Sequence, residues 1–133
     1  MVTLSFQTIC ERIRQTDFPE VDLVVGIGSG GLLPASIVAF HLKKDLSVMT
    51  INYRDENNTP RHDLPKVLSL PEQLLMGGKK ILLVDDVSVT GKTLQAAMEL
   101  LNGHDITTFT LKGKADLVLF PEIGDCVKWP WKG

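Results

Sequence analysis

Two adjacent acids that precede a turn of hydroxyl and glycine residues form the pattern in this chain with the clearest chemical use. Residues 81–94 read Ile-Leu-Leu-Val-Asp-Asp-Val-Ser-Val-Thr-Gly-Lys-Thr-Leu. The apolar run predicts a buried strand over Ile81–Val84, which brings Asp85 and Asp86 to the edge of a sheet. A helix is predicted to begin at Thr93, so the turn before it presents free N–H groups and the positive end of a helix dipole. Such a turn binds anions.

The same turn is suited to a phosphate group. Ser88, Thr90 and Thr93 add hydroxyl donors, and Gly91 lets the backbone approach a ligand closely. The paired acids would repel a phosphate unless they face something else, and the vicinal hydroxyls of a ribose and Mg²⁺ are the obvious candidates. A phosphate at one end and a diol at the other describe a ribose 5-phosphate.

The run Gly91-Lys92-Thr93 also invites comparison with the phosphate-binding loop of nucleotide hydrolases. That loop needs a glycine five residues before Gly91, where this chain has Asp86. A carboxylate at this position would point at the phosphates, so we exclude this class of site.

A second glycine-rich segment, Gly26-Ile27-Gly28-Ser29-Gly30-Gly31, follows a predicted strand and precedes a predicted helix. It satisfies the dinucleotide pattern Gly-x-Gly-x-x-Gly, and Asp55 is a passable candidate for the acid expected after the next strand. A helix precedes the first strand, however, and a dinucleotide site leaves the paired acids unexplained. A dinucleotide-binding module therefore stays as the alternative.

Residues 81–94 resemble the phosphoribosyl pyrophosphate motif of the type I phosphoribosyltransferases: four apolar residues, two acids, an apolar residue, two variable positions and Thr-Gly-x-Thr. The resemblance implies that Asp85 and Asp86 are catalytic residues that hold the ribose hydroxyls, with Asp86 also a ligand of Mg²⁺. It places the 5-phosphate against Ser88, Val89, Thr90, Gly91, Lys92 and Thr93.

In this family a short glycine loop cradles pyrophosphate through backbone N–H groups, and the resemblance extends over Val25–Ala39. It implies that the loop formed by Gly28, Ser29, Gly30 and Gly31 binds pyrophosphate. Ser29 stands where the family often has a basic residue, so Arg54, Arg61 or a partner subunit would have to supply positive charge. Members of the family are often homodimers, and we expect one here.

The C-terminal run Val127-Lys128-Trp129-Pro130-Trp131 is similar to the end of xanthine/hypoxanthine/guanine phosphoribosyltransferases, in which an aromatic residue stacks on the purine. Cys126 aligns with that aromatic residue, so stacking would fall to Trp129, unless the tryptophans cap the core or a dimer interface. Lys112, together with Lys114, is the candidate for contact with the exocyclic oxygen of a 6-oxopurine. Val89 replaces the acid that commonly precedes Thr-Gly in this group.

The order of apolar segments predicts one α/β domain over residues 1–133. Strands alternating with helices imply a parallel sheet with right-handed crossovers, and ligands bind beyond the carboxyl ends of its strands. The resemblance implies a twisted, mainly parallel sheet of about five strands flanked by helices, with a small C-terminal hood. The predicted strands are Val21–Ile27, Leu46–Tyr53, Ile81–Val84, Ile106–Leu111 and Leu117–Phe120. The first predicted helix has Leu4, Ile9 and Ile13 on one face, Thr3 or Ser5 as its N-cap, and ends before Asp17, and the later predicted helices are Leu32–Leu42 and Thr93–Leu101.

The polar segment Asp55–Leu70, with Pro60 and Pro65, is too long for a tight connection and is predicted to be a lid over the site. A histidine in a loop is usually solvated, but His62, as part of a lid, could contact pyrophosphate.

The composition is that of an ordinary globular protein: 133 residues, 44% hydrophobic, with a formal net charge of −2. It gives no basic face for nucleic acid and no apolar run long enough for a membrane helix. Cys10 and Cys126 lack metal-ligand spacing and are interpreted as reduced thiols of a cytoplasmic protein.

Three hypotheses follow. The first is an enzyme that uses Mg²⁺ to transfer phosphoribosyl from phosphoribosyl pyrophosphate to a nucleobase, with a 6-oxopurine favoured. The second is a non-catalytic regulator that binds the same ligand, and the third is the dinucleotide-binding module.

Overall fold

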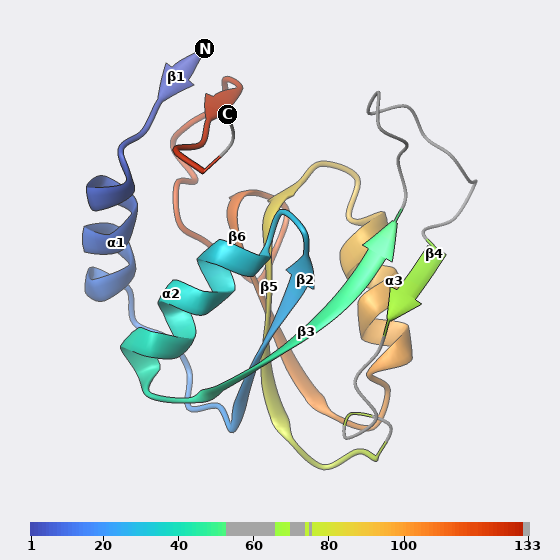
Figure 1. Cartoon of the computed structure of the whole chain (residues 1–133). Coiled ribbons are helices and arrows are strands. Elements are labelled where there is room, and N and C mark those ends of the chain that lie inside the picture. The colour runs from blue at the N-terminus through green and yellow to red at the C-terminus, as the bar shows by residue number, and fades with distance from the viewer. Residues whose placement is uncertain (53–65, 70–73, 75, 132–133) are drawn as a thin grey trace.

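A computed structural model describes residues 1–52, 66–69, 74 and 76–131, and in this part of the chain six strands form a central sheet (Figure 1). Five of them pair in parallel, in the order β3-β2-β5-β6-β7, and β4 pairs antiparallel with β3 at one edge. The mainly parallel sheet predicted from the sequence is confirmed. The strands are β2 (Leu23–Gly28), β3 (Asp45–Asn52), β4 (Lys66–Ser69), β5 (Lys80–Ser88), β6 (Asp105–Gly113) and β7 (Leu117–Val118).

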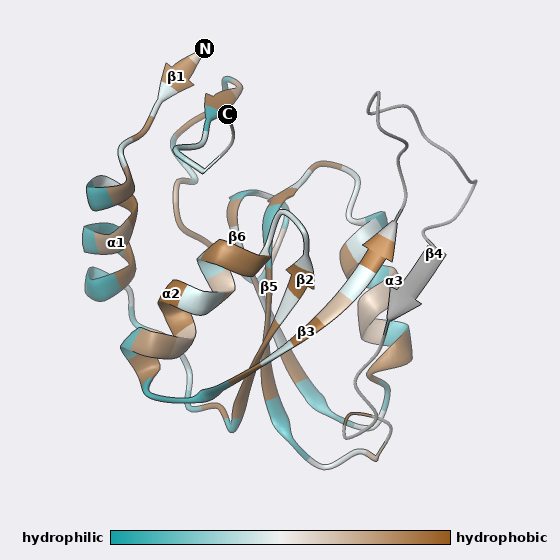
Figure 2. Cartoon of the chain, in the orientation of Figure 1, coloured by the Kyte–Doolittle hydropathy of each residue, from teal (hydrophilic) through white to brown (hydrophobic). Residues whose placement is uncertain are grey.

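Helices cover both faces of the sheet (Figure 1). Helices α1 (Phe6–Gln15) and α2 (Leu32–Leu42) pack on one face, and α3 (Lys92–Leu100) packs on the other. Because β2 and β5 lie in the middle with apolar layers on both sides, β2 consists of apolar residues and glycine, and β5 is apolar over Ile81–Val84 (Figure 2).

The first helix begins where the sequence predicts. Ser5 is its N-cap and accepts a hydrogen bond from the backbone N–H of Thr8, with an N···O distance of 3.0 Å. Ile9 and Ile13, one helical turn apart, are fully buried against the sheet. None of the described helices is both long and apolar enough to cross a membrane.

The two ends of the chain lie side by side (Figure 1). Strand β1 (Val2–Thr3) pairs in parallel with β8 (Val127–Lys128), outside the central sheet. This pair forms part of the small C-terminal hood, to which the N-terminus therefore also contributes.

Two strand boundaries differ from the sequence prediction. Strand β5 continues through the paired acids to Ser88, because Asp85 and Ser88 still pair with residues of β6. In the segment predicted as an irregular lid, Lys66–Ser69 is a strand that adds to the edge of the sheet. Residues 53–65, which include Arg54, Asp55, Arg61 and His62, lie outside the described residues.

Candidate active site

The paired acids are held in fixed orientations at the carboxyl end of β5. Asp85 and Asp86 are only 8% and 9% exposed. The Oδ1 atom of Asp85 accepts a hydrogen bond from the N–H of Asp86 at 2.8 Å, and the Oδ1 atom of Asp86 accepts one from the N–H of Val87 at 2.7 Å. These hydrogen bonds fix the rotation of both carboxylates.

The glycine loop that follows β2 lies directly against the second acid. A Cβ atom at Gly30 would fall 2.6 Å from Oδ2 of Asp86, and one at Gly31 would fall 2.6 Å from the carbonyl oxygen of Val84. Strands β2 and β5 are parallel neighbours, with Gly26 opposite Val84, so the segments that follow them leave the sheet side by side. The sequence therefore needs glycine here for close approach.

This loop presents backbone rather than side-chain groups. The N–H of Gly31 donates to the carbonyl oxygen of Ile27 at 2.8 Å, and α2 begins with no side-chain cap. The Gly28–Ser29 peptide bond is cis, and Ser29 is exposed. The positive charge at this point is the partial charge of a helix N-terminus.

The turn between β5 and α3 encloses a cavity of about 100 Å³. Gly91 has φ +83°, in the left-handed region that favours glycine, and α3 begins after it without a side-chain cap. Ser88 is only 6% exposed, and its Oγ atom has no hydrogen-bond partner among the described residues. An unpartnered buried hydroxyl beside a helix N-terminus fits a small oxyanion. The cavity is lined by Asp85, Val87, Ser88, Val89, Thr90, Gly91, Lys92 and Thr93.

Of the residues predicted to contact a nucleobase, one lies near the end of a strand and the other is buried in the core. Lys112 is half-buried opposite Val87 near the end of β6. Trp129 is 3% exposed within the core, and its ring stacks on Trp131 with 5.7 Å between ring centroids. Its contact with a base stays a prediction. Trp131, which the sequence analysis did not select, has a buried indole Nε1 with no partner among the described residues.

A family comparison fits this arrangement. The model of the phosphoribosyl transferase domain matches residues 5–112, which is most of the chain and includes both loops and the paired acids. The chain belongs to the phosphoribosyltransferase family.

Known phosphoribosyltransferases resemble this chain in sequence and in fold. It is 32% identical over 94 residues to an orotate phosphoribosyltransferase of Sulfurisphaera tokodaii, covering 71% of this chain and 42% of that protein. It is 39% identical over 82 residues to a xanthine-guanine phosphoribosyltransferase of Cereibacter sphaeroides, covering 58% and 46%. The chain thus spans less than half the length of these curated relatives.

The crystal structure of a purine phosphoribosyltransferase from Pyrococcus horikoshii has the same fold, with a TM-score of 0.76 at 23% identity, covering 99% of this chain and 94% of that chain. The fold of this phosphoribosyltransferase domain therefore continues beyond Lys112, where the family match ends.

The described part of this phosphoribosyltransferase domain has no cluster of three or more histidine, cysteine or acidic residues that could enclose a metal ion. The donors that it offers are the carboxylates of Asp85 and Asp86, of which Asp86 faces the glycine loop. Mg²⁺ is commonly bound by one or two carboxylates together with the phosphates of a substrate, so this donor set fits Mg²⁺.

Proposed function

We propose that this domain transfers the 5-phosphoribosyl group from phosphoribosyl pyrophosphate to a nucleobase and releases pyrophosphate. The observation that carries the proposal is the position of the acids between two anion-binding segments. Gly30 lies against Asp86 on one side, and the turn that begins at Ser88 encloses a cavity on the other. Phosphoribosyl pyrophosphate has the matching order of groups: a pyrophosphate, a sugar diol and a 5-phosphate.

Each segment then has one task. Asp85 and Asp86 accept hydrogen bonds from the ribose hydroxyls. The pyrophosphate lies against the backbone of the loop formed by Gly28, Ser29, Gly30 and Gly31, in which the N–H of Gly31 is already bonded to Ile27. The 5-phosphate lies in the cavity lined by Ser88, Val89, Thr90, Gly91, Lys92 and Thr93.

The reaction breaks the bond between C1 of the ribose and the pyrophosphate oxygen and forms a bond between C1 and a nitrogen of the base. Positive charge develops on the sugar ring as the first bond breaks. The carboxylates of Asp85 and Asp86 are fixed in place before the reaction, so they favour that charge without reorganising. Binding of the remote 5-phosphate supplies energy that orients the reacting centre.

Mg²⁺ would be held by Asp86 together with the pyrophosphate, and when bound it neutralises charge on the leaving group. The carboxylate of Asp86 is placed for this because it lies directly against Gly30, which belongs to the loop that would bind the pyrophosphate. A side chain at Gly30 would fill the space between them.

We propose a 6-oxopurine as the base. Lys112 near the end of β6 supports this, because an ammonium group there would donate to the exocyclic oxygen. One of the relatives named above is a xanthine-guanine phosphoribosyltransferase and another acts on orotate. The family match ends at Lys112, before the C-terminal segment that would face the base.

A non-catalytic regulator that binds the same ligand is the second candidate. Val89 lies in the turn between β5 and α3, is 72% exposed and has no group that exchanges a proton. Ser29 carries no charge in the glycine loop. Both positions lack a group that the family resemblance assigns to catalytic members, while the paired acids and the turn between β5 and α3 stay in place for the ligand.

We also propose a homodimer in the cytoplasm. Helix α2 is apolar on nearly every face, as helices buried on all sides are, yet Phe40 on it is 87% exposed and Leu32 is 43% exposed. A second copy of the chain would cover these side chains. Cys10 and Cys126 are both free, as is usual for proteins of a reducing compartment.

The deciding experiment supplies phosphoribosyl pyrophosphate and Mg²⁺ with xanthine, hypoxanthine, guanine, adenine, orotate or uracil and measures released pyrophosphate. Turnover with a 6-oxopurine is the expected result. Tight binding of phosphoribosyl pyrophosphate without turnover on any base would select the regulator. Saturable binding of NAD that is indifferent to Asp85→Asn would select the dinucleotide module.

A further inference from the structure

The connection between β6 and β7 packs against the end of β5. It lies next to the turn between β5 and α3, here called the phosphate turn. The N–H of Lys114 donates a hydrogen bond to the carbonyl oxygen of Ser88 at 2.8 Å. Gly113 before it has φ +103°, and a Cβ atom there would overlap the carbonyl of Ser88. The backbone of Lys114 is therefore held against Ser88, the residue that precedes Val89 at the start of the turn.

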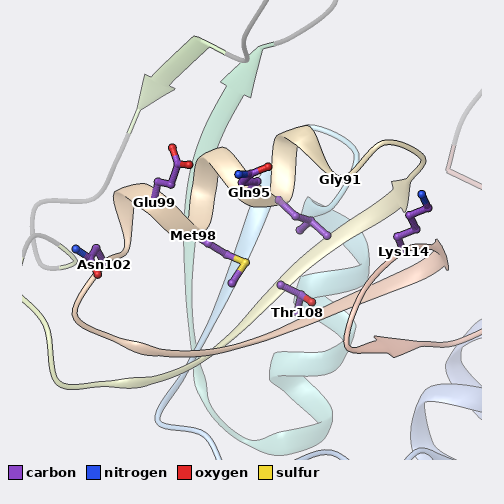
Figure 3. A pocket seen from close by; sticks show the side chains of 8 residues that line it. Gly91, Gln95, Met98, Glu99, Asn102, Thr108 and Lys114 are labelled. Atoms are coloured by element: carbon purple, nitrogen blue, oxygen red, sulfur yellow. The ribbon is translucent and has the colours of Figure 1, made fainter.

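The side chain of Lys114 extends toward this turn. It is exposed and lines a groove of about 650 Å³ whose other side is α3. Figure 3 shows its ammonium group beside the end of β5, directed toward the connection between β5 and α3. Gly91 lines both this groove and the cavity of the phosphate turn, so the two spaces adjoin at that residue.

The charge of Lys114 is available to a ligand. Lys114 makes no ion pair within the described part of the chain, in contrast to Arg12, which pairs with Glu122, and Lys44, which pairs with Glu20. A sugar phosphate brings close to two negative charges at neutral pH. Asp85 and Asp86 add further negative charge to the same end of β5, so a nearby cation lowers the electrostatic cost of binding the phosphate.

We propose that the ammonium group of Lys114 contacts the 5-phosphate of the bound phosphoribosyl group. This inference rests on the proposed function and adds a residue to its phosphate site. It also separates two lysines that the sequence groups together, because Lys114 serves the phosphate whereas Lys112 is left for the base. The β5–α3 turn supplies hydroxyl donors, a helix N-terminus and Lys92, and Lys114 adds a positive charge from the neighbouring strand connection.

The test is equilibrium binding of ribose 5-phosphate and of phosphoribosyl pyrophosphate with Mg²⁺, by calorimetry, to the wild type, Lys114→Gln, Lys114→Arg and Lys79→Gln. Lys79→Gln is the matched control because Lys79 is an exposed lysine at the opposite end of β5. Loss of one charge-assisted hydrogen bond is expected to weaken binding of both ligands to Lys114→Gln by about 10-fold. Lys114→Arg and Lys79→Gln should stay within about 3-fold of the wild type, since one keeps the charge and the other lies far from the site.

Two results would overturn the inference and can be told apart. If the wild type binds both ligands and Lys114→Gln binds them equally well, Lys114 does not contact the phosphate, while the proposed function stands. If the wild type binds neither ligand, the proposed function fails and the role of Lys114 fails with it. In the enzyme assay, Lys114→Gln should lower kcat/KM for phosphoribosyl pyrophosphate by about 10-fold, in line with the weaker binding.

Discussion

Gly30 lies so close to Asp86 that a single added carbon would stand 2.6 Å from the Oδ2 atom of the acid and 2.8 Å from its Cγ atom. Gly30 comes from the loop after β2 and Asp86 from the end of β5, and the pairing of these two strands brings them together. A loop that would bind pyrophosphate and an acid that would bind ribose and Mg²⁺ thus share one space. This contact leaves no space for a side chain at position 30.

Gly30→Ala should therefore lower kcat/KM for phosphoribosyl pyrophosphate by at least about 10-fold, because a displacement of the acid or the loop by a fraction of an ångström misplaces bound groups. Steady-state kinetics would measure the loss. Gly124→Ala is the control, since a Cβ atom at Gly124 would meet nothing within 4 Å. Equal activity of the two variants would show that the contact is not functional.

Asp86→Asn should reduce kcat by about 100-fold or more, because it removes a charge that would face a developing cation and a metal ion. The amide oxygen can still accept the hydrogen bond from the N–H of Val87, so thermal unfolding should change little. Titration with Mg²⁺ should show a higher requirement in Asp86→Asn than in Asp85→Asn. The same requirement in both variants would contradict the assignment of the metal to Asp86.

Val89→Asp restores an acid at the position where related purine enzymes commonly have one. Val89 is 72% exposed, so the change should alter the free energy of unfolding by less than about 0.5 kcal/mol. If the base is a 6-oxopurine, turnover should rise, with a new loss of activity below about pH 4 as the carboxylate is protonated. Val89→Asn has a similar size and no titratable proton, so a rise in both variants would argue against proton transfer.

Arg12→Ala should destabilise the fold by about 1–2 kcal/mol, since it removes a part-buried hydrogen bond and a cation–π contact. Arg12 donates to the carbonyl oxygen of Leu119 at 3.1 Å, and its guanidinium lies 4.5 Å from the ring centroid of Phe120, which joins α1 to the C-terminal segment. Urea unfolding at pH 7 would measure the change. Lys44→Ala breaks an ion pair of 3.8 Å near the surface and should have almost no effect.

The carboxylate of Glu122 makes the stability of the contact between Arg12 and the C-terminal segment depend on pH. Its pKa is lowered, first by a backbone hydrogen bond and then by the side chain of Arg12. Because the pKa is lower in the folded chain than in the unfolded one, the stabilisation is present above the usual glutamate pKa of about 4.3 and is lost as the pH falls through the folded value. Glu122→Gln should reduce this acid loss, and an unchanged acid transition would show that Glu122 does not contribute.

The sequence predicts the strand–turn–helix around Asp85 well, because its signals are contiguous. Four apolar residues indicate the strand, and the residues from Thr90 onward indicate the turn and the helix. The end of β5 is predicted too early, since charged residues usually mark the end of a buried strand. Here Asp85 still pairs with Thr110 of β6, and that pairing is set by the neighbouring strand.

The short strand β4 could not be predicted from its own residues. Lys66–Ser69 is a strand because it pairs antiparallel with the end of β3, at an edge of the sheet where polar residues are tolerated. The family resemblance likewise points to Trp129 for the base, whereas packing places that indole in the core against Trp131.

The sequence by itself determined the paired acids and the two loops that are predicted to bind anions, since each depends on the order of a few consecutive residues. Only the tertiary structure decided that Gly30 lies against Asp86 and that the backbone of Lys114 is bonded to Ser88. The physical reason is that β2, β5 and β6 are neighbours in the sheet but far apart in the sequence. Strand order is set by the packing of the whole core, and no local pattern encodes it.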